Sequence, residues 1–117
     1  MIIKEYIRDD DSNPYEKWFN SLNSQAAAKV AVAIARIELG NTSNIKWFEG
    51  IGEYKINWGP GYRIYLIQDG SELIILFGGG TKKTQPADIK KAKKLYEEYK
   101  TCKRGKLWVV QEIIKKQ

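Results

Sequence analysis

The chain has 117 residues, a net charge of +6, no histidine and one cysteine, and 43% of its residues are hydrophobic. This size fits a single domain that buries its own core. The composition excludes an internal disulfide, histidine-based catalysis and zinc sites that need imidazole, and no apolar run approaches the roughly 20 residues of a membrane-spanning helix. Because charged residues occupy the place of a signal peptide's apolar core, we expect a cytoplasmic protein.

The positive charge is concentrated at the C-terminal end. Residues 81–117 hold 12 basic and 4 acidic residues, whereas residues 1–80 hold 8 basic and 10 acidic residues. A basic segment of this kind attracts polyanions, most often nucleic acids. A lysine-rich helix that is simply solvated explains the same pattern, so both interpretations stay open.

The first third of the chain predicts a strand followed by two helices. Residues 1–7 are rich in β-branched and aromatic side chains, which favours a strand. Asn13 is a typical helix N-cap, and Pro14 suits the first helical position. Apolar residues then recur at helical spacing over 15–22 and 25–39, so we expect an antiparallel pair of helices joined by a short connection.

The middle of the chain predicts a sheet. Residues 53–58 alternate strictly between apolar and polar side chains, and a second strand over 62–67 follows a Gly-Pro-Gly turn. Residues 73–77 are continuously apolar, which indicates a central strand covered on both faces. A shorter strand is expected over 45–48, and the glycines at 78–80 are predicted to end the sheet.

A last helix is predicted from Gln85, after a basic loop over 81–84. The resulting order, β-α-α-β-β-β-α, defines an α+β fold with an antiparallel sheet and helices packed on it. We assign the domain to residues 1–100 and a basic C-terminal extension to residues 101–117, in which residues 106–117 are weakly amphipathic at helical spacing.

Strand parity predicts a basic site on one face of this sheet. Lys55 lies on the face opposite Tyr54, and the antiparallel return of the chain places Arg63 on the same face as Lys55. The basic loop after the last strand is positioned to close over that face. We therefore expect five cations to converge on one concave surface: Lys46, Lys55, Arg63, Lys82 and Lys83.

Such a cluster is suited to RNA cleavage without metal or histidine. The substrate's ribose 2′-OH is the nucleophile, and an arginine stabilises the charge of the pentavalent phosphorane. A lysine whose pKa is lowered by neighbouring cations acts as acid or base. A plain anion-binding surface is the alternative that the residues leave open.

Five segments in a fixed order resemble one known family. They are residues 13–18, 50–56, 59–65, 79–85 and 88–92. Together they resemble the RelE/ParE superfamily of bacterial toxins, and most closely the HigB-like addiction module killer proteins of the phage-derived Gp49-like group. The resemblance extends from the first residue to about residue 100.

The resemblance implies the toxin of a type II toxin–antitoxin system with a RelE-like (microbial RNase-like) fold, in which two N-terminal helices and a C-terminal helix pack on a twisted antiparallel sheet. It implies a metal-independent, ribosome-dependent mRNA endoribonuclease that inhibits translation and needs no cofactor. The implied partners are a cognate antitoxin, the ribosome and mRNA. Operator DNA is bound only through the antitoxin complex, and no membrane is involved.

Matching positions carry over the expected roles of individual residues. The resemblance implies catalytic roles for Lys55, Arg63, Lys82 and Lys83. Further contacts to RNA are expected from Lys46, Gln85, Lys90 and Lys91.

The chain also departs from the family pattern. RelE-like members use a tyrosine, and HigB members often a histidine, near the C-terminal end of the site, but this chain has no histidine and no tyrosine between Tyr65 and Tyr96. Thr81 stands where the killer-protein branch commonly has an aspartate. Two alternatives therefore stay open, namely a ParE-like inhibitor of DNA gyrase and a catalytically silent remnant that binds a partner or DNA.

Overall fold

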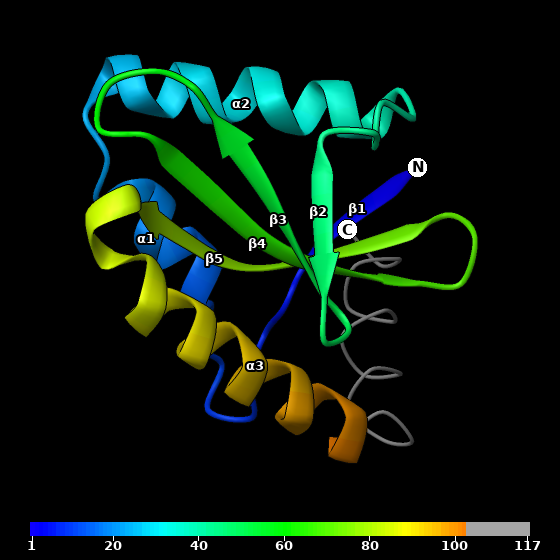
Figure 1. Ribbon diagram of the computed structural model, residues 1–117. Coiled ribbons are helices and arrows are strands. Elements are labelled where there is room, and N and C mark those ends of the chain that lie inside the picture. Colours follow the sequence, from blue (N-terminus) through cyan, green and yellow to red (C-terminus); the bar gives the residue numbers. More distant parts are fainter. Residues whose placement is uncertain (103–117) are drawn as a thin grey trace.

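The computed structural model describes residues 1–102 (Figure 1). They form five strands, β1 (Ile2–Glu5), β2 (Ile45–Phe48), β3 (Ile51–Ile56), β4 (Tyr62–Asp69) and β5 (Leu73–Thr81). They also form helices α1 (Pro14–Asn20), α2 (Ser24–Glu38) and α3 (Gln85–Cys102). The predicted extension over 101–117 lies almost entirely outside this part of the chain, as does its amphipathic segment.

The strands form one mixed sheet in the order β1-β5-β4-β3-β2. Strands β2 to β5 pair antiparallel, but β1 pairs parallel to β5, so the prediction of an antiparallel sheet is wrong at this edge. No hairpin joins β1 to β5, because the rest of the sheet and two helices separate them in sequence, and their direction is therefore not imposed by a turn. The segment at 45–48 joins the sheet as edge strand β2, so the order is β-α-α-β-β-β-β-α rather than β-α-α-β-β-β-α.

Helices cover both faces of the sheet (Figure 1). Helices α1 and α2 pack on one face around Val30, Ile64 and Leu76, which are at most 2% exposed. Helix α3 packs on the other face, against Tyr65 and Phe77. The α+β class and the central, doubly covered position of β5 are as predicted.

The predicted helix starts are confirmed by their capping contacts. Asn13 precedes α1, its side-chain oxygen accepts a hydrogen bond from the Glu16 amide, and Pro14 is the first residue of the helix. Asn23 caps α2 in the same way through the Ala26 amide. These side chains satisfy amide groups that have no partner inside the helix.

The glycines at 78–80 do not end the sheet, contrary to the sequence-based expectation. Strand β5 continues through them to Thr81. A Cβ atom on Gly79 would overlap the indole of Trp18, and one on Gly80 would overlap the carboxylate of Asp88. These glycines therefore allow α1 and α3 to approach the backbone of β5 closely.

A single 3₁₀ turn, Lys82–Thr84, connects β5 to α3. The Thr81 amide donates to the Thr84 hydroxyl, which also contacts the Asp88 carboxylate. The segment predicted as a basic loop is thus a short ordered turn, fixed at the end of the sheet where β4 begins.

Candidate functional site

The register of the sheet brings the predicted basic residues of the strands to one face. Lys55 on β3 lies directly opposite Arg63 on β4, and Lys46 on β2 lies opposite Glu53 on β3. Residues opposite each other in a ladder share a face of the sheet. The predicted parity of Lys46, Lys55 and Arg63 is therefore confirmed, and their face is the one that α3 covers.

Arg63 is the buried centre of this face, with only 4% of its surface exposed. Its Nη1 donates to the carbonyl of Gly61 at 2.8 Å. Its Nε lies 3.7 Å from Oε2 of Glu53 and has no hydrogen-bond partner among residues 1–102. The guanidinium of Arg63 therefore has contacts at Nη1 and at Nε, and its Nε–H group can still donate a hydrogen bond.

Glu53 is a functional candidate that the sequence analysis missed. It is 7% exposed, and its Oε2 accepts hydrogen bonds from the Tyr65 hydroxyl at 3.0 Å and from Nε2 of Gln85 at 2.8 Å. One carboxylate thereby links β3, β4 and the first residue of α3. Strand alternation placed Glu53 on the face of Lys55, and this parity was the available signal for its role.

The environment of Tyr65 keeps its hydroxyl protonated. Burial is the largest cause that raises the pKa of this phenol above its ordinary value, and the nearby negative charge of Glu53 raises it further. The phenol is therefore a hydrogen-bond donor to Glu53 in the resting site.

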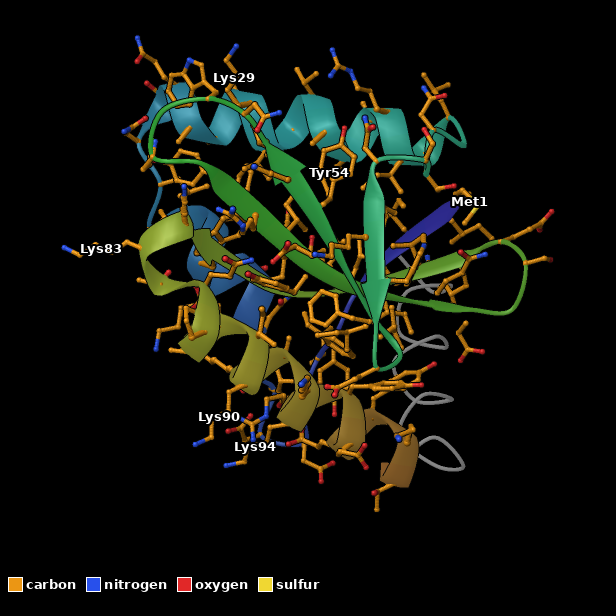
Figure 2. The ribbon with its side chains drawn as sticks, viewed as in Figure 1. Met1, Lys29, Tyr54, Lys83, Lys90 and Lys94 are labelled. Atoms are coloured by element: carbon orange, nitrogen blue, oxygen red, sulfur yellow. The ribbon has the colours of Figure 1, made fainter. Side chains whose placement is uncertain are left out.

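The basic residues of the turn differ in where they lie. The Cβ of Lys82 and the Nη1 of Arg63 both lie within 4 Å of where a Cβ on Gly61 would stand, so the two residues are neighbours. Lys83 is exposed, and Figure 2 shows its side chain pointing away from the sheet. The structure thus brings Lys82, but not the side chain of Lys83, to the Arg63 site.

The four residues expected to contact RNA do not form one cluster. Gln85 hydrogen-bonds Glu53 inside the site, and Lys46 is exposed on edge strand β2. Lys90 points outward from α3 (Figure 2). Lys91 is exposed and lines a cavity of about 50 Å³ between α1, α3 and β5.

The charges of the site therefore have two layers. The inner layer is the ion pair of Glu53 and Arg63, in which the two side chains are 8% and 5% exposed. The outer layer consists of the exposed lysines Lys55 and Lys82. An anion that approaches this end of the sheet meets the lysines first and the guanidinium behind them.

Within residues 1–102, no group of three or more histidine, cysteine, aspartate or glutamate side chains is arranged to hold a metal ion. No helix in that range has the length and apolar character required to cross a bilayer.

The fold and site define a small α+β domain with a five-stranded mixed sheet between helical layers and a buried Glu53–Arg63 pair at one end. The chain belongs to the same family as an uncharacterized protein of Haemophilus influenzae. The two are 43% identical over 86 residues, which cover 72% of this chain and 87% of that protein. No family model matches the chain, and no solved structure matches it significantly.

Proposed function

We propose that the protein is the toxin of a type II toxin–antitoxin pair and acts as a metal-independent endoribonuclease on ribosome-bound mRNA. The RelE-like fold and the assignment of residues 1–100 as the toxin domain are parts of this proposal. The observation that supports it is the site itself: Arg63 lies opposite Lys55 in the β3–β4 ladder and next to Lys82, with Glu53 as its buried counter-ion.

In the proposed reaction the 2′-oxygen of the substrate attacks the adjacent phosphorus and the bond to the 5′-oxygen breaks. The products are a 2′,3′-cyclic phosphate and a 5′-hydroxyl. Arg63 offers its planar donors to the non-bridging oxygens, where negative charge increases in the transition state. Of the exposed residues Lys55 and Lys82, one acts as the general base that accepts the proton of the 2′-hydroxyl, and the other, in its protonated form, donates a proton to the leaving 5′-oxygen.

The second candidate function is a binding protein without catalysis, such as a gyrase inhibitor or a silent remnant. The burial of Arg63 and its pairing with Glu53 favour this candidate, because a paired arginine inside a domain is also a common structural feature. Under this alternative Arg63 shapes the surface and never contacts substrate.

Primer extension on a defined mRNA in a purified translation system separates these functions. The nuclease proposal predicts cuts at the ribosomal A site that require both the protein and ribosomes. A DNA supercoiling assay with purified gyrase is run on the same preparation. Intact mRNA together with inhibited supercoiling would establish the gyrase alternative, and intact mRNA with unaffected gyrase would leave the silent binding protein.

A further inference from the structure

A groove of about 360 Å³ runs between α2 and the end of β3, on the side of the sheet that α1 and α2 cover. The Arg63 site lies on the other face. Figure 2 shows Lys29 on α2 and Tyr54 beneath that helix, between it and the sheet. The groove therefore lies across the sheet from the Arg63 site, and Lys55, at the edge of β3, is the one residue among 1–102 that borders both.

The wall formed by α2 is a stripe of exposed residues. Lys29, Val32 and Arg36 follow one another at spacings of three and four, which places them along one side of the helix. Val32 is 50% exposed, although most large apolar side chains of residues 1–102 are covered. This side of α2 is distinct from the one that packs on the core through Val30 and Ile37.

The opposite wall is an open edge of the sheet. Strand β2 begins at Ile45, which pairs with Tyr54, so β3 extends two residues beyond β2. Lys55 and Ile56 have a strand partner on the β4 side only. An exposed strand edge offers backbone groups to an added extended peptide.

All charged side chains that line the groove are positive. Three cations line it, Lys29, Arg36 and Lys55, and no carboxylate does. None of the three has an ion-pair partner within residues 1–102. Lys29 lies over the ring of Trp58 at 5.6 Å and limits the groove at that end.

We propose that this groove binds an acidic, extended segment of a partner protein, which adds to the open end of β3. Apolar side chains on one side of such a segment would pack on Val32 and Ile56, and its carboxylates would pair with Lys29 and Arg36. Alternate side chains of an extended peptide point to opposite sides. This alternation matches a groove that offers apolar contacts at Val32 and Ile56 and positive charges at Lys29 and Arg36. Single-stranded nucleic acid is less suited, because it needs a basic path that follows several consecutive phosphates.

The test is an NMR titration of the isotope-labelled full chain with a synthetic eight-residue peptide in which glutamate and valine alternate. The proposal predicts saturable shifts of the amides from Lys55 to Trp58 and of the exposed side of α2. The double variant Lys29→Glu/Arg36→Glu should weaken binding by about tenfold or more, because it reverses two charges at the rim. The matched control Lys17→Glu/Lys94→Glu carries the same change of net charge at exposed positions outside the groove and should bind within about twofold of the wild type.

Other occupants give different results. Equal weakening by both double variants, or shifts confined to α3, would mean attraction by net charge alone and would overturn the proposal. Shifts of the groove residues on raising the protein concentration without peptide would assign the groove to a second copy of the chain. Saturable shifts at the same residues with a short single-stranded RNA, but not with the peptide, would assign the groove to nucleic acid.

Discussion

Glu53 on β3 and Arg63 on β4 form an ion pair in the interior, with Oε2 and Nε 3.7 Å apart. Burying two charges costs free energy that their attraction offsets only when further hydrogen bonds are present. Tyr65 and Gln85 donate such bonds to Glu53, and the Gly61 carbonyl accepts one from Arg63. The pair therefore depends on contacts from the sheet and from the start of α3.

Removing one member of this pair should destabilise the fold strongly. We expect Glu53→Ala to lower the free energy of unfolding by about 3–5 kcal/mol, because Arg63 is left buried without a counter-ion. Urea unfolding measures this change, and Glu72→Ala, at an exposed position, should stay within about 0.5 kcal/mol of the wild type. If the double variant Glu53→Ala/Arg63→Met loses as much stability as the two single variants added together, the two residues are not coupled.

The close approach of α3 to β5 predicts a sterically coupled pair. Gly80→Ala should lower the free energy of unfolding by about 1–3 kcal/mol, because the added methyl group overlaps the Asp88 carboxylate. The same substitution should cost less in an Asp88→Ala background, where the overlapping atoms are absent. Thermal unfolding of the four proteins measures the coupling, and equal costs in both backgrounds would show that Asp88 is not the obstacle.

Burial of Tyr15 predicts a loss of stability at alkaline pH. Burial, and to a smaller extent the charge of Glu5, raise the pKa of this phenol from 10.0 to about 12. Between these two pH values the unfolded chain releases the proton while the folded protein keeps it, so the free energy of unfolding falls as pH rises. The contribution lost is roughly 2–3 kcal/mol. Urea unfolding between pH 9 and pH 12 should show a shallower decline for Tyr15→Phe, and an unchanged decline would contradict the assignment.

The different placements of Lys55 and Lys83 predict different kinetic effects. Lys55 lies opposite Arg63, whereas Lys83 points away from the sheet (Figure 2). In the ribosome-dependent cleavage assay, Lys55→Ala should lower kcat by about 10²-fold or more, as expected for a group acting at the reacting phosphate. Lys83→Ala should mainly raise KM, because an outward lysine attracts RNA without contacting the reacting atoms. A larger loss of kcat in Lys83→Ala than in Lys55→Ala would reverse these roles.

The parts of the fold that could be predicted are those set by local periodicity. The N-cap at Asn13, the existence of helices α1 and α2 and the alternation of β3 all arise from neighbouring residues. The expected antiparallel packing of the two helices is not confirmed, because α1 packs mainly on β5 and makes few contacts with α2. The parallel pairing of β1 with β5 could not be predicted, because it depends on strands at opposite ends of the domain. The glycines at 78–80 were misinterpreted because the side chains that require them belong to other elements: Trp18 is distant in sequence, and Asp88 lies on the helix that follows the strand.

The site was predictable to a similar extent. Strand parity correctly placed Lys55 and Arg63 together, since it needs only the alternation and one turn. The buried state of Arg63 and the central place of Glu53 were missed, because Gln85 and the covering helix come from another part of the chain. Parity identifies a face of the sheet, and tertiary packing decides which residues on it are exposed.

The measurement that tests the account most directly is the single-turnover rate of cleavage of ribosome-bound mRNA by the wild type, Arg63→Lys and Lys55→Ala. Arg63→Lys keeps the buried positive charge, and Lys55→Ala changes an exposed side chain, so NMR spectra should confirm that both variants fold. If Arg63 and Lys55 act at the reacting phosphate, the wild type cleaves mRNA at the A site and both variants lose about 10²-fold or more in rate. Absence of cleavage by the folded wild type, or cleavage at the wild-type rate by both variants, would contradict the account.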